Sequence, residues 1–482
     1  MNIDHKMTKT IVEWFEKVNE IPRCSKNEKA ICEWLAKWAE ENGFSAKTDK
    51  VENLLIEVPA SPGYENSPVV VLQGHMDMVC EKTKGSTHDF EKDPIPVRLD
   101  GGWLKAESTT LGADNGIAIA MALALALDKN TPHPPLEFLF TVDEETGLTG
   151  ATALESDFLK GKILLNIDSE DEGVFTIGCA GGKDARVTMP FKPVTAPDGY
   201  KSFKIIAGGM SGGHSGVDIH EQRANAIKVL TRTLHTIMSK GDLRLASIEG
   251  GTAHNAIPRD AEAVVFMQAA AADSAKQLVD ELSGVLAAEH AKTDPNLSLT
   301  MVAATGENQA LSTKETRRVI DFLLAYPHGV AFMSNDIEGL VETSDNLATV
   351  KTGASKIEIM SSQRSSNMNK LDFLTDQIAC LTRLAGAEVE IGGGYPAWKP
   401  DMDSKLLAKC KEVFVGMFGK EPIVEIIHAG LECGIIGAKY DGMEMISIGP
   451  TIKNPHSPDE KIDVESIGKF WDFLAALLKS IK

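Results

Sequence analysis

The sequence lacks the cysteine patterns of disulfide-rich and zinc-finger proteins. Its 7 cysteines are scattered over 482 residues, and no Cys-X-X-Cys pair occurs. We therefore expect neither a disulfide framework nor a cysteine-rich zinc site. A hydrophobic fraction of 43% is enough for a sizeable core without cross-links, and a reducing cytoplasm suits such a chain best.

Long apolar runs are also missing. The longest, IAIAMALALAL at 117–127, is too short for a transmembrane helix, which needs about 20 residues. The first residues, MNIDHKMTKTIVEWFEKV, are charged and amphipathic, unlike a secretory signal. We expect a buried helix at 117–127, no membrane partner and a cytoplasmic location.

Basic residues are scarce relative to acidic ones. Lys and Arg number 49 against 69 Asp and Glu, which gives a formal net charge of −20. Because such a charge disfavours binding to nucleic acids and anionic membranes, neither is expected as a partner. The charge does not identify which small molecule the protein handles.

Apolar stretches of strand length alternate with helical periodicity in the first part of the chain. Segments 68–75, 135–147 and 162–171 each begin as a buried strand and end in His or acidic residues. Segment 111–127 has the pattern of a loop that leads into a helix. This alternation predicts an α/β fold, with a mostly parallel central sheet flanked by helices.

The pattern changes from about residue 186. Segment 186–395 resembles two loosely repeated α+β units, and the Gly/Pro-rich IGGGYPAWKPD that follows is typical of a hinge. Further helix and strand patterns then return. The simplest architecture is one α/β domain, formed by 1–185 and 397–482, which an inserted α+β domain at 186–396 interrupts.

Polar residues recur just past the ends of predicted strands or at helix entries. They are His75, Asp114, Glu144, Glu145, Asp168 and His456. In open α/β sheets, the crevice outside the strand C-termini is where ligands bind. Imidazole and carboxylate groups in this number suit a pair of divalent metal ions, zinc above all, with manganese or cobalt as competitors.

The run TVDEETG at 141–147 raises a question of charge, because it places three carboxylates directly after a buried strand. Like charges repel one another there and are costly to desolvate. A pair of divalent ions would supply about four positive charges to offset them, and would activate a shared water.

Nine motifs stand out along the chain: VLQGHMDMV, TTLGADNGIA, DEETGLTGA, NIDSEDEG, GCAGG, GGHSGVDIH, HNAIPRDA, HAGLECGII and SIGPTIKNPHSPDEKI. Together they make the chain resemble the co-catalytic zinc peptidases, the family that includes glutamate carboxypeptidase, acylamino-acid deacylases and bacterial dipeptidases. The motifs run from residue 71 to beyond 460, so the resemblance covers essentially the whole chain. GGHSG and the last two favour the dipeptidase branch.

The resemblance implies a role for each of these polar residues. His75 and Asp168 would bind one metal ion, His456 and Glu145 the other, and Asp114 would bridge them. Asp77, two residues past His75 on a strand-like segment, would face the same way and accept a hydrogen bond from its free ring nitrogen. Glu144 would be the general base that moves a proton from the bridging water to the leaving amine.

The inserted domain would supply groups that bind substrate. His214 resembles a lid histidine that stabilises the oxyanion, and Asn255 and Arg364 resemble substrate clamps, with Arg364 on a C-terminal carboxylate. The resemblance implies hydrolysis of dipeptides, of Xaa-His type and including β-Ala-His, by a homodimer that pairs through the lid domain. It assigns no role to His428 or Glu432.

Other functions compete with this hypothesis. A related deacylase or carboxypeptidase would use the same metal site, and a peptide-binding protein would need the metals but no proton shuttle such as Glu144. A nucleotide-binding α/β protein is a poor alternative, because neither IGGGY nor GCAGG matches a phosphate-binding fingerprint.

Overall fold

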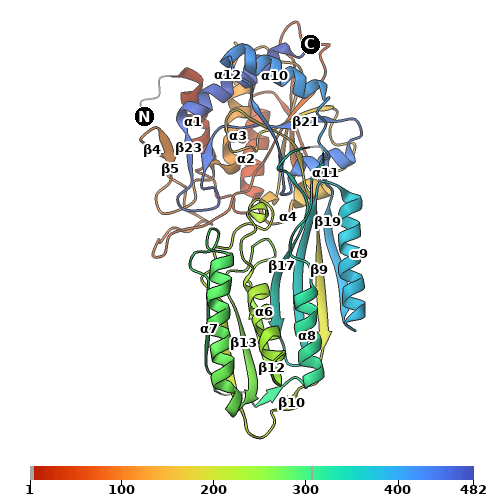
Figure 1. Cartoon of the computed structure of the whole chain (residues 1–482). Coiled ribbons are helices and arrows are strands. Elements are labelled where there is room, and N and C mark those ends of the chain that lie inside the picture. The colour runs from red at the N-terminus through yellow and green to blue at the C-terminus, as the bar shows by residue number, and fades with distance from the viewer. Residues whose placement is uncertain (1–4, 306–307, 336) are drawn as a thin grey trace. The chain divides into compact units, whose positions relative to one another are not determined.

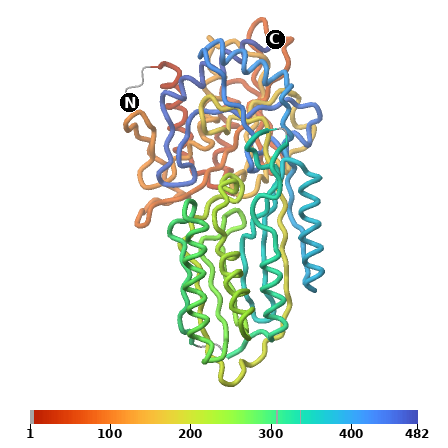
Figure 2. Tube along the Cα trace, in the orientation of Figure 1, coloured from red at the N-terminus to blue at the C-terminus, as the bar shows by residue number. Residues whose placement is uncertain are grey.

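The computed structural model describes residues 5–305, 308–335 and 337–482, which form two compact units (Figure 1). The first unit comprises Met1–Cys179, Trp398–Ile426 and Leu431–Lys482. The second unit comprises Ala180–Ala397 and Ile427–Gly430. In Figure 2 the red beginning and the blue end of the trace therefore run together in the first unit.

Eight strands form the main sheet of the first unit, in the order β1-β2-β6-β3-β7-β21-β8-β20. Four neighbours, β6, β3, β7 and β21, run parallel to one another, whereas β1, β2 and β8 pair antiparallel. The strand bounds are Ser45–Thr48 (β1), Leu54–Val58 (β2), Val70–His75 (β3), Leu136–Thr141 (β6), Ile163–Asn166 (β7), Val174–Cys179 (β8), Ile423–Ile427 (β20) and Glu444–Ser447 (β21). The predicted α/β class is confirmed, and the parallel strands are the central ones.

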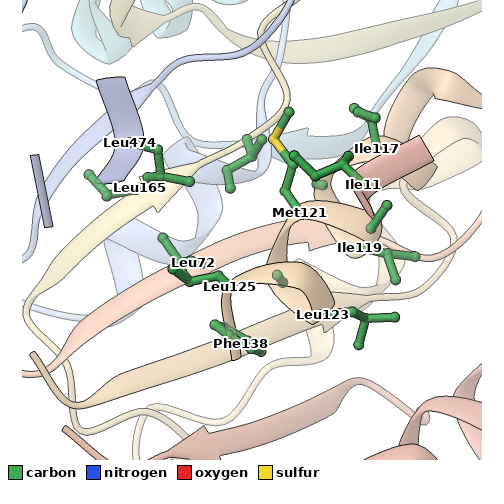
Figure 3. Packing of buried hydrophobic residues seen from close by; sticks show 14 of the residues in the cluster. Ile11, Leu72, Ile117, Ile119, Met121, Leu123, Leu125, Phe138, Leu165 and Leu474 are labelled. Carbon is green, nitrogen blue, oxygen red and sulfur yellow. The ribbon is translucent and has the colours of Figure 1, made fainter. Parts of the chain in front are cut away.

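The apolar helix α3 (Ala113–Leu127) is the centre of the first core, as the run at 117–127 predicts. A helix that is apolar all round must be covered on every side, and α3 packs against β3 and against α1 (Lys6–Val18). Figure 3 shows its side chains beside Leu72 of β3 and Phe138 of β6. Among the described residues, no helix has the length and apolar character needed to cross a membrane.

Four longer helices of the first unit are amphipathic and turn one apolar face toward this core. They are α1, α2 (Lys29–Glu41), α10 (Lys405–Phe418) and α12 (Val464–Ser480), and the short helix α11 (Glu432–Lys439) lies outside the core cluster. In α12 the buried side chains recur at helical spacing, and α12 packs on α1 and α10. The segment after residue 397 thus returns to complete the first unit.

The second unit contains a nine-stranded antiparallel sheet, in the order β14-β11-β13-β12-β17-β18-β9-β19 with β16 beside β17. The strand bounds are Gly181–Pro190 (β9), Tyr200–Gly208 (β11), Leu243–Gly250 (β12), Ala261–Gln268 (β13), Ser298–Ala303 (β14), Gly329–Met333 (β16), Val341–Thr352 (β17), Lys356–Ser365 (β18) and Glu388–Tyr395 (β19). Its long helices are Ala226–Met238 (α6), Ala272–Glu289 (α7), Thr313–Ala325 (α8) and Met368–Leu384 (α9). β12 and β17 pair at only two residue positions. This short pairing joins the strands on either side of it into one sheet.

One disulfide joins Cys24 to Cys80, which the spacing of the cysteines does not predict. The two residues lie 56 positions apart, and their Cα atoms are 5.7 Å apart. An isolated parallel β-bridge between Cys24 and Met78 brings the two segments together. Five other cysteines are free, and no disulfide framework forms among the described residues.

Candidate metal centre

The parallel strands of the first unit present polar residues at one edge of the sheet. β3 ends on His75, β6 is followed by Glu144 and Glu145, and β7 is followed by Asp168. Because β3 runs parallel to both β6 and β7, these residues meet at the C-terminal edge. Asp114 joins them from the start of α3.

Two imidazoles flank the carboxylate of Asp114. Its Oδ1 lies 3.1 Å from Nε2 of His75, and its Oδ2 lies 3.1 Å from Nε2 of His456. On the first side, Oδ1 of Asp168 is 3.4 Å from Nε2 of His75. On the second side, Oε2 of Glu145 is 3.0 Å from Nε2 of His456. The five side chains therefore form two His–carboxylate pairs that share one carboxylate.

The two halves of this cluster differ in exposure. The side chains of His75, Asp168 and Glu145 are 1%, 7% and 4% exposed, whereas that of His456 is 50% exposed. His456 lies in the loop between β22 (Ile452–Lys453) and β23 (Lys461–Asp463). Solvent therefore reaches the cluster from the His456 side.

The carboxylates stabilise positive charge on both rings. Burial opposes a charge on His75, but the carboxylates of Asp168 and Asp114 outweigh it and raise the pKa of His75 well above its usual value. Hydrogen bonds to Asp114 and Glu145 raise the pKa of His456 to about 11. The same contacts lower the pKa of Asp114 against the effect of its burial. The cluster as a whole therefore favours cations.

The donor set fits divalent metal ions. Ligand atoms of His75, Asp114 and Glu145 all lie within 4.8 Å of one another. Within the part of the chain that the structure describes, Oε1 of Glu145 and Oδ1 of Asp168 are buried without a hydrogen-bond partner. Buried carboxylate oxygens are costly unless a donor or a cation meets them, and imidazole with carboxylate is a zinc-type donor set.

Asp77 links His75 to the acidic run. Its Oδ1 is 3.3 Å from Nδ1 of His75 and accepts a hydrogen bond from the backbone N–H of Glu144 at 3.0 Å. Its Oδ2 accepts from the N–H of Glu145 at 3.2 Å. One carboxylate therefore orients the imidazole and the start of the short helix α4 (Glu144–Gly147) together.

The three acids of the run have different environments. Asp143 accepts hydrogen bonds from the hydroxyls of Thr146 and Thr149, so hydrogen bonds rather than cations satisfy it. Burial, with help from neighbouring carboxylates, raises the pKa of Glu144 well above its usual value. Glu145 contacts His456. Of the three, Glu145 is therefore the acid with a direct contact to a ring of the cluster.

Arg23 lies behind the cluster and is one of the residues that the sequence analysis misses. Its guanidinium is buried and donates to the carbonyl oxygens of Met76 and Asp77, both at 3.1 Å, and of Gly112 at 2.5 Å. A Cβ at Gly112 or Gly116 would lie 2.6 or 2.5 Å from its Nη2. The glycines beside Asp114 thus make room for this arginine, a contact that no motif signals.

Asn115 is also missed, although it stands directly after Asp114. Its Oδ1 lies 3.3 Å from the backbone N–H of His75, and its Nδ2 donates to the carbonyl oxygen of Ile167 at 2.6 Å. One amide side chain therefore joins the backbone beside His75, Asp114 and Asp168. Its place next to a candidate ligand is the only signal in the sequence.

Glu432 lies under the same sheet edge. Its Oε2 accepts from Nε2 of Gln73 at 2.6 Å and from Oγ1 of Thr141 at 2.7 Å. Asn166 donates in turn to Gln73 at 2.6 Å. Burial raises the pKa of Glu432 to about 7. A hydrogen-bonded network therefore crosses β7, β3 and β6 just before the residues of the cluster.

The remaining predicted residues lie in the second unit. The backbone carbonyl of Asn255 accepts from the N–H of Ser215, in the loop that follows His214. Arg364 is 6% exposed and donates to the hydroxyl of Tyr395 at 2.7 Å.

His428 also belongs to the second unit. Its Nε2 is 2.7 Å from Oγ of Ser344. Burial, with repulsion from Arg364 and His214, lowers the pKa of His428 to about 3. The ring is therefore neutral at physiological pH.

Comparison with known proteins places this chain in one family. Residues 71–480 match the model of peptidase family M20/M25/M40. The cytosol non-specific dipeptidase of Escherichia coli K12 is 43% identical over 467 residues, which cover 97% of this chain and 96% of the relative. The chain belongs to peptidase family M20/M25/M40, so the prediction of a metallopeptidase is confirmed.

Solved structures agree with this assignment. The aminoacylhistidine dipeptidase of Vibrio alginolyticus is 40% identical, with a TM-score of 0.88, and covers 100% of this chain and 98% of its own. Aminopeptidase PepT from Bacillus cereus covers 98% of both chains with a TM-score of 0.56 at 17% identity, which shows the shared fold alone.

Proposed function

We propose that this protein is a dipeptidase that hydrolyses unsubstituted dipeptides, Xaa-His and β-Ala-His among them, with two zinc ions. The observation that carries the proposal is the sharing of Asp114 between the pairs His75–Asp168 and His456–Glu145. The names of two relatives of at least 40% identity, a non-specific and an aminoacylhistidine dipeptidase, support this substrate class.

The chemistry is divided between the ions and the chain. When bound, the ions polarise the scissile carbonyl and activate the attacking water. Glu144 takes a proton from that water and gives it to the leaving amine. Asp77 fixes the positions of the Glu144 backbone and of the His75 ring through contacts at 3.0 and 3.3 Å, respectively. Manganese or cobalt in place of zinc would leave these roles unchanged.

Further parts of the proposal concern the inserted domain. Residues 1–185 and 397–482 form the catalytic domain, and 186–396 form a lid through which a cytoplasmic homodimer pairs. His214 stabilises the oxyanion, while Asn255 and Arg364 bind the substrate. The buried guanidinium of Arg364, already oriented by Tyr395, supports its assignment to a carboxylate.

A panel of substrates before and after chelation tests the reaction. We expect hydrolysis of dipeptides, loss of that activity on chelation and its return with zinc, because the ions activate the water. N-acyl amino acids and longer peptides should be poor substrates. Preferred cleavage of N-acyl amino acids would instead indicate a deacylase, and metal-dependent binding without cleavage would indicate a peptide-binding protein.

Arg364→Ala tests the proposed carboxylate contact. The variant should raise the KM for free dipeptides much more than for C-terminally amidated ones, because only the former carry the carboxylate that the guanidinium binds. Arg232→Ala is the matched control, since Arg232 of α6 pairs with Glu289 instead. Equal changes in KM for both substrate types would remove Arg364 from the carboxylate site.

A further inference from the structure

Glu460 is a buried carboxylate that binds the loop before Asp114. Its side chain is 3% exposed. Oε2 accepts from the backbone N–H groups of Leu111 and Gly112 at 2.7 and 2.9 Å. Oε1 accepts from those of Ala113 and Asp114 at 2.7 and 3.2 Å. One side chain thus satisfies four successive N–H groups at the entry to α3.

The same residue belongs to the loop that carries His456. Glu460 stands four positions after His456 and directly before β23, and its own N–H donates to the carbonyl of Ser457 at 3.0 Å. The backbone of His456 has a φ of 58°, a left-handed conformation that a non-glycine residue rarely adopts without support. Glu460 therefore joins this strained loop to the loop that carries Asp114.

A second side chain, that of Arg23, also binds the loop before Asp114. The guanidinium of Arg23 donates to the carbonyl of Gly112, while Glu460 accepts from the N–H of the same residue. The peptide groups around Gly112 are thus held at both their donors and their acceptors. Little freedom remains for Asp114 to shift relative to His456.

We infer that Glu460 is a positioning residue that sets the distance between His456 and Asp114, and thereby the affinity of the half of the metal centre that contains His456. The inference rests on the proposed metal centre. Groups that orient metal ligands without touching the ion change metal affinity about 10–100-fold when they are replaced.

The chemistry of the carboxylate distinguishes it from an amide. Two oxygens can accept from four N–H groups, whereas glutamine offers one oxygen and an NH₂ group that would face two donors. Glu460→Gln therefore keeps the size of the side chain and disrupts half of the contact. Buried donors left without acceptors are costly, so the loops should separate or shift.

Zinc titration against a chromogenic chelator, with the ion count from mass spectrometry, tests the inference on the full chain. The wild-type protein should bind two ions, and E460Q should hold one of them at least about tenfold more weakly. In a His456→Ala background, E460Q should add little further loss, because the loop no longer carries a ligand. Unchanged zinc affinity in E460Q, or an equal further loss in the His456→Ala background, would overturn the inference.

Glu137→Gln is the matched control. Glu137 is a 2% exposed carboxylate at the start of β6 that accepts from the backbone N–H groups of Lys160 and Gly161 at 3.0 Å. E137Q should lower the melting temperature without changing zinc affinity. If E137Q weakens zinc binding as much as E460Q, the effect is general destabilisation and the inference fails.

Failure of this inference and failure of the proposed function can be distinguished. If E460Q does not fold, Glu460→Asp serves as a second variant. It keeps the charge, shortens the side chain and should weaken the binding of one zinc ion. Failure of both variants to fold while E137Q folds would assign Glu460 to stability alone and contradict the inference. Two tightly bound ions in a wild-type protein that cleaves no dipeptide would refute the proposed function and leave the role of Glu460 to be decided by the same titration.

Discussion

Replacing Glu144 by glutamine should leave two metal ions bound and lower the turnover of dipeptides by about 10²–10⁴-fold. Glutamine matches glutamate in shape but cannot accept the proton of the attacking water. The backbone N–H of Glu144, which donates to Asp77, is unaffected by the change. Steady-state kinetics and the ion count of the same preparation provide the measurement.

The neighbouring residue is the matched control for this result. Glu145→Gln replaces a carboxylate that lies 3.0 Å from the ring of His456 with a neutral amide. The variant should therefore bind one ion more weakly and also have a lower turnover. Loss of an ion from the Glu144 variant would make Glu144 a ligand. Full turnover in that variant would exclude it as the general base.

Replacing Asp114 by alanine should have the largest effect on metal binding. Its two oxygens each lie 3.1 Å from one of the two imidazoles, so both halves of the centre lose a donor at once. Loss of an outer hydrogen-bond partner lowers metal affinity about 10–100-fold. We expect the affinity for both ions to fall by more than this. Zinc titration and the dipeptide assay measure the two consequences.

Asp294→Ala is the control for loss of a buried acid. Asp294 is 0% exposed in the second unit and accepts from the N–H groups of Ser211 and Ala224, both at 2.8 Å. That variant should lose stability but keep two ions. An Asp114→Ala protein that holds either ion as tightly as the wild type would show that the two halves do not share this carboxylate.

Much of the site could be anticipated because strand ends are visible in a sequence. The Val-rich run before His75 and the apolar runs before Glu144 and Asp168 indicate buried strands, and parallel strands bring their ends together. The apolar helix after Asp114 can be predicted from the sequence equally well. The central α/β sheet follows from the same alternation, whereas the antiparallel strands at its edges have no comparable signal.

The supporting contacts could not be anticipated, because they join distant segments through backbone atoms. Arg23 binds a carbonyl 89 positions away, and Glu460 binds N–H groups 346 to 349 positions away. A residue that binds backbone leaves no trace in the identity of its partner. The pairing of Cys24 with Cys80 depends in the same way on the folded path of the chain.

The number of metal ions held by each wild-type chain tests the central claim most directly. After incubation with zinc and removal of the excess, mass spectrometry under native conditions should show two ions per chain, released together with activity on chelation. This result follows from two His–carboxylate pairs that share Asp114. A protein that cleaves dipeptides at full rate with one ion or none would contradict the account.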